Sequence, residues 1–193
     1  MNTEQLILAH SMRLFAEKGY HGTSIEDITR SAGLTKGALY WHFKNKEDLI
    51  KKIIKEYEGR FLDKMIQVVG EVKGGALEKF EKYLRFCSVF PYHNQDLCIS
   101  FDSLSVELAG AHHKIEPEIV RIRKKYLRFI SDLIVQGKKE RVFNPKLNTR
   151  YAALAIEAFQ HGGLIQWSMN KNGIDGKRFV KALDHIVLNG IKR

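Results

Sequence analysis

The chain has 193 residues, of which 44% are hydrophobic and 28% are charged. This balance is typical of a globular protein that buries a core without disulfides or metals, and it excludes an intrinsically disordered chain. The longest apolar runs are far below the ~18 residues that span a membrane, and no secretory signal opens the chain. Because its two cysteines, Cys87 and Cys98, make no disulfide framework either, we expect a cytoplasmic protein.

The basic charge of the chain is unevenly distributed. A formal net charge of +10 suggests nucleic acid or another polyanion as a partner. Residues 1–48 contain six basic and six acidic side chains, so the whole excess lies in residues 49–193. Net charge therefore does not locate a nucleic-acid site, and the local order of residues must do so.

Three short helices are predicted in the N-terminal quarter. The spacing of apolar residues predicts a helix over 3–18, which Gly19 ends. Two overlapping capping-box patterns within residues 23–27 begin a second helix, and Gly33 is placed for the positive φ of the tight turn that follows it. A third helix follows over residues 35–43.

Longer helices are predicted for the rest of the chain, and no alternating pattern indicates a strand. The helices are expected over 46–72 without interruption, 76–90, 97–110, 117–139, 149–170 and 175–189, with a loop at 91–96 and turns at 143–145 and 172–173. The sequence therefore predicts an all-α chain.

The second and third helices form a helix-turn-helix pattern over about residues 24–43. The N-terminal end of the second helix of such a pair enters the major groove of DNA. The outward positions of this helix offer hydroxyl, ammonium, aromatic and imidazole groups, together with a glycine that permits close approach: Thr35, Lys36, Gly37, Tyr40, Trp41 and His42. Lys46 begins the next helix, where an ammonium group and unpaired N–H groups both favour phosphate.

The same segment carries a dense match to a known family. The matching runs are LFAEKGY over 14–20, TSIEDI over 23–28 and AGLTKGALYWHFKNKEDL over 32–49. Over about 45 residues the chain resembles the TetR (tetracycline-repressor) family of bacterial transcription regulators. It departs from the family pattern at His10-Ser11, where a pair of alanines is usual, and at Thr29, where alanine is usual.

The resemblance implies a homodimeric repressor that a small molecule releases from a palindromic DNA operator, and no enzyme. Residues 1–62 would form the helix-turn-helix DNA-binding domain, including the start of the fourth helix, and residues 63–193 a helical-bundle ligand-binding and dimerisation domain. The DNA contacts of the family carry over to Thr23, Ser24, Thr35, Lys36, Gly37, Tyr40, Trp41, His42 and Lys46. No cofactor and no membrane contact are implied.

Ligand and dimer contacts are expected in the C-terminal part. Large apolar residues and one histidine are the candidates for a ligand cavity: Phe61, Met65, Leu84, Phe101, Leu104, His161 and Trp167. Gln160 and Asp102 are further polar residues within apolar helices and so candidates for specificity. The last two helices carry more apolar residues than one buried face needs, which predicts a dimer interface that includes Phe159, Gly162, Ile165, Phe179, Leu183 and Ile186.

The predicted helix over 46–72 begins beside the DNA and runs into the ligand-binding segment. In a dimer, each copy has one helix over residues 35–43 that enters the major groove, which we call the reading helix. A ligand that displaces the helix over 46–72 is expected to change the separation of the two reading helices. DNA release would follow from that change.

Two other classes of function are less well supported by the sequence. A small helical-bundle enzyme is disfavoured because no nucleophile elbow, P-loop, HExxH or dinucleotide-binding glycine pattern is present. A non-DNA adaptor with the same fold is disfavoured because Lys36, Tyr40 and Lys46 are retained. No metal site is predicted, since the spacing of His93, Cys98 and the pair 112–113 matches no zinc pattern.

Overall fold

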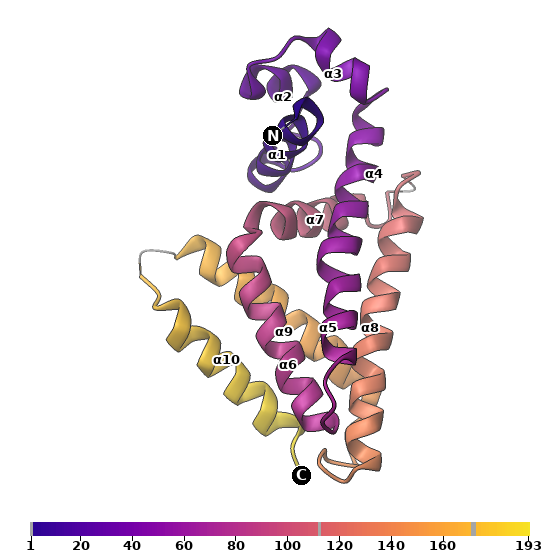
Figure 1. The fold of residues 1–193 in the computed structure, drawn as a ribbon, viewed down its shortest axis with the longest axis vertical. Coiled ribbons are helices and arrows are strands. Elements are labelled where there is room, and N and C mark those ends of the chain that lie inside the picture. The colour runs from indigo at the N-terminus through magenta and orange to yellow at the C-terminus, as the bar shows by residue number, and fades with distance from the viewer. Residues whose placement is uncertain (1, 112, 171–172) are drawn as a thin grey trace. The chain divides into compact units, whose positions relative to one another are not determined.

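The computed structural model describes residues 2–111, 113–170 and 173–193. Within them the chain forms ten α-helices and one π-helical segment, η1, and no β-strand (Figure 1). The chain divides into two compact units, Met1–Phe61 with Asn94–Ile122, and Leu62–His93 with Arg123–Arg193. The predicted all-α fold is confirmed. The predicted boundary at residue 62 was meant to separate a DNA-binding domain from a ligand-binding and dimerisation domain. The two compact units are divided differently, because residues 94–122 belong to the first unit. The division by function stays a prediction.

The first unit is built around α1, which packs against α2 and α7. Its elements are α1 (Thr3–Lys18), α2 (Ile25–Ala32), α3 (Lys36–His42), α4 (Lys46–Tyr57), α7 (Gln95–Leu108) and the first turns of α8 (Glu116–Lys139). Apolar residues at helical spacing point inward and are fully buried, among them Ile7, Phe15, Ile28, Leu39, Leu49 and Leu104. This core holds the two helices of the helix-turn-helix in place.

Side-chain caps fix where the short helices begin. Ser24 Oγ accepts a hydrogen bond from the Asp27 N–H (3.1 Å), and the Asp27 carboxylate accepts one from the Ser24 N–H (3.0 Å). The structure therefore uses the second of the two overlapping capping boxes. Thr35 and Asn45 accept in the same way from the third residue of α3 and of α4, at 3.2 and 2.9 Å. Such caps each contribute about 1 kcal/mol to helix stability.

Glycines end α1 and α2 in conformations that other residues rarely adopt. Gly19 has φ of 70° and Gly33 has φ of 66°, both in the range that favours glycine. A side chain at Gly19 would also collide with Glu107, whose carboxylate oxygen lies 1.8 Å from the place a Cβ would take. The turn after α1 is therefore restricted to glycine for two independent reasons.

The predicted uninterrupted helix over 46–72 is wrong in one respect. α4 ends at Tyr57, the π-helical segment η1 (Glu58–Asp63) follows, and α5 (Lys64–Gly70) continues the chain. A π-helix forms hydrogen bonds over five residues rather than four, and it usually appears as a local bulge inside an α-helix. The apolar periodicity of the sequence does not distinguish this local widening from a regular helix.

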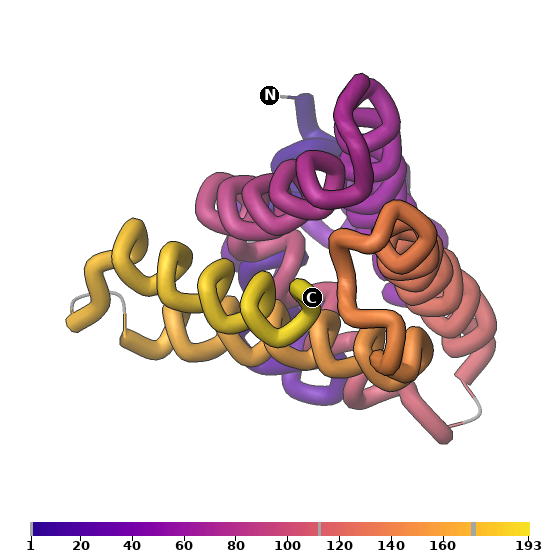
Figure 2. The backbone as a smooth tube through the Cα atoms, turned by 90° about the horizontal axis from the view of Figure 1, so that it is seen from below, coloured from indigo at the N-terminus to yellow at the C-terminus, as the bar shows by residue number. Residues whose placement is uncertain are grey.

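The second unit contains α5, α6 (Ala76–His93), most of α8, α9 (Thr149–Met169) and α10 (Gly176–Ile191). α9 and α10 lie side by side, as the two views of the chain show (Figures 1 and 2). The core of this unit is rich in large side chains that are fully buried, including Met65, Phe80, Tyr83, Ile130, Ile134 and Phe143.

The predicted loop at 91–96 is also wrong. α6 continues through Pro91 to His93, and α7 begins at Gln95. A proline in the last turn removes only its own hydrogen bond to the carbonyl four residues earlier, and α6 ends two residues later. The turn predicted at 172–173 lies partly outside the described residues, because residue 172 is not among them.

Candidate functional site

α3 presents its polar and aromatic residues to solvent because its apolar side is anchored. Leu39 is fully buried, and Phe43, which follows the helix, is 4% exposed. The opposite side carries Tyr40, 51% exposed, and Trp41, 86% exposed. The remaining predicted contacts of this helix are exposed as well, namely Thr35, Lys36, Gly37 and His42. The structure therefore brings these six residues together on one exposed segment of about two turns.

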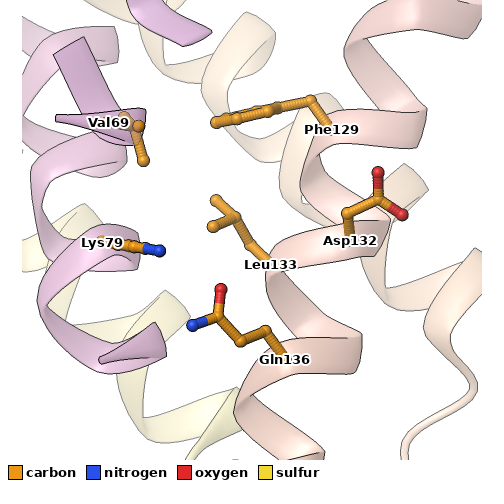
Figure 3. A pocket seen from close by; sticks show the side chains of 7 residues that line it. Val69, Lys79, Phe129, Asp132, Leu133 and Gln136 are labelled. Carbon is orange, nitrogen blue, oxygen red and sulfur yellow. The ribbon is translucent and has the colours of Figure 1, made fainter. Parts of the chain in front are cut away.

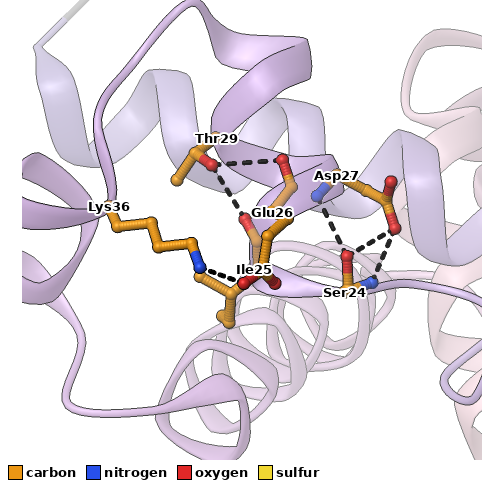
Figure 4. Close-up of polar contacts among 6 residues, drawn as sticks. All are labelled: Ser24, Ile25, Glu26, Asp27, Thr29 and Lys36. Atoms are coloured by element: carbon orange, nitrogen blue, oxygen red, sulfur yellow. Dashed lines mark hydrogen bonds and ion pairs between the residues drawn. The ribbon is translucent and has the colours of Figure 1, made fainter.

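An ion pair joins the start of α3 to the start of α2. The Lys36 ammonium donates a hydrogen bond to the Glu26 carboxylate (Figure 4). The bond raises the pKa of Lys36 and lowers that of Glu26. Both side chains are about half exposed, so a DNA phosphate can compete with Glu26 for the ammonium.

Ser24 and Thr23 have different roles in the structure. Ser24 is exposed at the start of α2, and its hydroxyl lies 2.6 Å from the Asp27 carboxylate. Thr23 is 1% exposed, and its hydroxyl donates to the carbonyl groups of Leu14 (3.2 Å) and Gly19 (2.8 Å). The Thr23 side chain therefore fastens α2 to the end of α1, and the predicted DNA contact of Thr23 stays a prediction.

Lys46 is turned toward the protein. Its ammonium donates to the Tyr20 carbonyl and lies 3.9 Å from the centroid of the Tyr20 ring. Burial lowers the pKa of Lys46 below its ordinary value. The phosphate contact predicted for Lys46 stays a prediction, and the structure adds an internal role that the sequence pattern did not reveal.

Glu107 of α7 holds the turn between α1 and α2. Its carboxylate accepts hydrogen bonds from the N–H groups of Tyr20 (2.9 Å) and His21 (3.1 Å) and from the Ser103 hydroxyl (3.2 Å). Burial alone would raise the pKa of Glu107, but the hydrogen bonds from His21 and Tyr20 hold it below its ordinary value. Sequence reasoning missed this residue, because it lies more than 80 positions from its partners.

The departures from the family pattern are accommodated by local hydrogen bonds. Ser11 Oγ donates to the Ile7 carbonyl (2.7 Å), and Thr29 Oγ1 donates to the carbonyl groups of Ile25 and Glu26 (both 3.1 Å; Figure 4). His10 Nδ1 lies 2.8 Å from the Ser31 hydroxyl. None of these bonds involves α3, so the departures leave the exposed segment unchanged.

The predicted ligand residues are divided between the two units. Phe61, Phe101 and Leu104 belong to the first unit, and Met65, Leu84, His161 and Trp167 to the second. Five of them are buried, and only His161 and Trp167 are half-buried. A pocket of about 200 Å³ in the second unit is lined by none of the seven, but by Val69, Gly70, Lys79, Phe129, Asp132, Leu133 and Gln136 (Figure 3). Of the polar specificity candidates, Gln160 contacts Tyr83 and Tyr126 inside the second unit.

The predicted dimer residues lie on α9 and α10 and are only partly covered. Ile165 is 46% and Ile186 57% exposed, and Phe159, Phe179 and Leu183 are half-buried. Gly162 faces open space, whereas a Cβ on the neighbouring Gly163 would lie 2.8 Å from Leu183. The packing of Leu183 therefore explains why residue 163 is a glycine, whereas no contact within the chain explains the glycine at 162.

The described residues contain no group of three or more His, Cys, Asp or Glu side chains that could hold a metal ion. Residue 112, which the sequence analysis weighed for such a site, lies outside the described part of the chain. No helix in the described part is long and apolar enough to cross a membrane.

Two family models match the chain. The model described as bacterial regulatory proteins of the tetR family matches residues 7–53, and that of the C-terminal region of YsiA-like protein matches residues 50–190. The fatty acid metabolism regulator protein of Bacillus subtilis is 26% identical over 187 residues, covering 96% of this chain and 93% of that relative. QacR, an HTH-type transcriptional regulator of Staphylococcus aureus, is 24% identical over 195 residues and covers 100% of both chains.

Solved structures agree with these matches. The MbdR regulator from Azoarcus sp. CIB has a TM-score of 0.89 at 27% identity and covers 98% of both chains. FadR from Bacillus subtilis, solved in complex with stearoyl-CoA, has a TM-score of 0.76 at 25% identity and covers 97% of this chain and 98% of its own. The chain is accordingly a DNA-binding transcription regulator of the repressor type and not an enzyme. It belongs to the tetR family of bacterial regulatory proteins.

Proposed function

We propose that the chain binds a palindromic operator as a homodimer and that a small molecule releases it. The observation that carries this proposal is the exposed segment of α3, where Lys36, Tyr40 and Trp41 project from a helix whose other side is buried. Exposed aromatic side chains of this size are costly in water and are suited to contacts with bases and sugars. Lys36 and His42 supply donors for base edges or phosphates.

Dimerisation is supported by an apolar stripe along α9. Leu154, Ile165 and Met169 are 39%, 46% and 74% exposed, and they follow one another at helical spacing with Ala158 and Gly162 between them. A monomer gains nothing from an exposed stripe of this kind, whereas a second copy of the chain would cover it. The open space at Gly162 would permit close approach of two helices.

The dimer explains how a ligand would act. Two reading helices must match half-sites about 34–36 Å apart, so DNA affinity depends on their separation. A ligand that favours another separation by about 1–3 kcal/mol weakens DNA binding, and DNA then weakens ligand binding by the same factor. The break in regular helix at η1 (Glu58–Asp63) lies within the segment that we propose to transmit this change.

The ligand class is proposed from the relatives. One is a fatty acid metabolism regulator, and another was solved with stearoyl-CoA. A long-chain acyl thioester is therefore the first ligand to test. Stearoyl-CoA added to the protein–DNA complex is expected to release the DNA, with stearate and free coenzyme A as controls for the two halves of the molecule.

The operator can be selected from a random DNA library by the purified chain. We expect the selected sequences to be palindromic and fluorescence anisotropy to give a stoichiometry of two chains per site, or a multiple of two. Ile165→Asp places a charge in the apolar stripe and should yield a monomer by sedimentation, whereas Val106→Asp, at an exposed apolar residue of α7, should not. Selection of asymmetric sites by a monomeric wild type would refute the proposal.

A further inference from the structure

The basic excess of the chain lies in the second unit. The first unit, which carries α3, contains 12 basic and 13 acidic side chains, whereas the second contains 20 basic and 9 acidic ones. Their formal charges are therefore −1 and +11. A basic surface is the usual electrostatic mark of a protein that meets a polyanion. Here that mark is absent from the unit with the reading helix and strong in the other unit.

Five exposed cations gather where α8 is joined to α9. The segment between these helices pairs with the residues after α10, because the Asn144 N–H donates to the Ile191 carbonyl (2.9 Å) and the Arg193 N–H donates to the Val142 carbonyl (3.3 Å). Figure 2 shows that end of the chain beside the segment between α8 and α9. We call the five exposed residues brought together in this way the basic turn: Lys139, Arg141, Lys146, Lys192 and Arg193.

The cations of the basic turn differ from those in the middle of α8. Arg123 is paired with Glu157 at 3.4 Å, and Lys125 is paired with Asp63, both within the second unit. Among the residues that the structure describes, no carboxylate forms an ion pair with any member of the basic turn. The positive charge at this end of the second unit is therefore available to a partner.

The basic turn is held firmly by the core and by α6. Phe143 within it is fully buried, and its ring centroid lies 5.5 Å from that of Phe80. The Glu140 carboxylate accepts hydrogen bonds from the Ala76 N–H (2.6 Å) and the Gln136 amide (2.7 Å), and these bonds lower its pKa. A turn fixed in this way presents its cations without having to be ordered when a partner binds.

Arg141 occupies a backbone conformation that favours glycine. Its φ of 61° is the one positive φ of a non-glycine residue in the described part of the chain. The Val142 N–H donates to the Gly137 carbonyl (3.0 Å) and the Arg141 N–H to the Lys138 carbonyl (3.1 Å), the pattern of a helix end at which glycine is usual. Arginine at this position lowers stability relative to glycine, so folding does not account for it. Its exposed guanidinium adds a cation to the surface.

The phosphate backbone of DNA is the polyanion that fits this surface. The chain belongs to a family of DNA-binding regulators, so DNA is a polyanion that it meets. Separate cations around a turn suit successive phosphates and need no pocket, and the pocket of the second unit is lined by none of the five. A surface that inserts into a membrane adds apolar side chains to its cations, whereas residues 139–148 expose no large apolar side chain.

We propose that the basic turn binds DNA phosphates without reading sequence, as a second DNA contact besides α3. The phosphates belong to the flanks of the operator or to another duplex, and both sources offer the same chemistry. The contact raises the affinity of the chain for DNA of any sequence and weakens as salt is added.

Two triple variants remove the same charge from different places. The first neutralises three lysines of the basic turn: Lys139→Gln, Lys146→Gln and Lys192→Gln. The matched control neutralises three exposed lysines of α5, α6 and α8: Lys64→Gln, Lys82→Gln and Lys124→Gln. Because both variants lower the net charge by the same amount, long-range attraction to DNA falls equally, and only direct phosphate contacts distinguish them.

Fluorescence anisotropy with a long random-sequence duplex at several salt concentrations measures those contacts. We expect the first variant to lose about tenfold in affinity at low salt and about two to three units in the slope of log affinity against log salt. The control should change the slope by less than about one unit. Both variants should select the same operator as wild type, since α3 is intact in each. Equal slopes in the two variants would overturn the inference.

Arg141→Gly separates a DNA contact from a structural role. Glycine suits the positive φ, so the variant should unfold at a higher urea concentration than wild type. It should also bind the random duplex about twofold to fivefold more weakly, whereas Arg141→Lys should bind it nearly as wild type does. A more stable Arg141→Gly chain that binds the random duplex like wild type would contradict the proposal.

A capture experiment identifies the source of the phosphates. Immobilised operator is loaded with the chain and then offered a labelled random duplex. Capture of that duplex indicates another DNA molecule, whereas tighter binding of an operator with long flanks, without capture, indicates the flanks. Either result supports the proposal if the basic-turn variant loses it and the control keeps it. Neither result, or binding of the basic turn to phosphatidylserine vesicles but not to random DNA, would overturn it.

Discussion

Replacing Glu107 by glutamine tests whether α7 holds the DNA-binding helices in place. The wild-type carboxylate accepts from the N–H groups of Tyr20 and His21, and these residues lead directly into α2. Glutamine keeps one acceptor oxygen and turns an NH₂ group toward the other N–H. One backbone donor then loses its partner and faces a second donor.

The expected cost follows from those two bonds. A hydrogen bond to a charged group contributes about 1.5–3 kcal/mol where it is buried, and less where water reaches it. The bond to Tyr20 is part-buried and the bond to His21 is exposed, so we expect a loss of about 2 kcal/mol in the free energy of unfolding. Urea unfolding measures the loss, and Glu17→Gln, at an exposed carboxylate of α1, serves as the control.

Hydrogen exchange gives a residue-level result for the same variant. The amides of Tyr20 and His21 should exchange faster in Glu107→Gln, while the amide of Leu39 in α3 should change less.

The contribution of Glu107 to the free energy of unfolding should depend on pH with a definite sign. Because the folded-state pKa of Glu107 is lowered, its stabilisation is full above the ordinary carboxyl pKa of 4.5 and is lost as pH falls through the lower folded value. Wild type and variant should therefore converge in acid, and a constant difference down to pH 2 would refute the assignment.

Other substitutions test the DNA-binding surface and the dimer. Glu26→Gln frees Lys36 and should tighten binding to any DNA by about twofold to fivefold relative to Glu17→Gln. Tyr40→Ala should weaken the selected operator more than random DNA in a gel shift. Lys46→Met removes the ammonium from the Tyr20 carbonyl and ring, and should lower the free energy of unfolding by about 1 kcal/mol. Gly162→Leu fills the open space on α9 and should weaken the dimer in sedimentation; a wild-type dimer strength would contradict the proposed interface.

Local signals explain why the N-terminal helices were predictable. The cap at Ser24, the positive φ of Gly33 and the buried position of Leu39 all arise from residues within four positions of one another. Short-range hydrogen bonds and apolar spacing therefore locate α1, α2 and α3 without any knowledge of the fold. In the structure Leu39 and Phe43 are buried, while the six outward residues predicted for this segment are exposed.

Contacts between distant segments account for what the sequence did not reveal. The two overlapping capping boxes are equivalent as patterns, and only the folded chain shows that the Thr23 hydroxyl is used by Leu14 and Gly19. Likewise, Lys46 at a helix start is typical of a phosphate contact, and the nearby Tyr20 ring that holds it becomes visible only when α1 and α4 are packed.

Gln160 shows both a local signal that the sequence reveals and distant contacts that it does not. A polar side chain on an apolar helix indicates a specificity residue from the sequence alone, because burying an amide without partners is costly. The pattern does not identify those partners, since Tyr83 lies 77 positions and Tyr126 34 positions away. Both tyrosines also suit a plain core at the spacing they occupy. Their hydroxyl groups distinguish the two roles, because phenylalanine would fill the same space and leave Gln160 without a partner. Replacing both tyrosines by phenylalanine should therefore lower the free energy of unfolding unless Gln160 is replaced by an apolar residue as well.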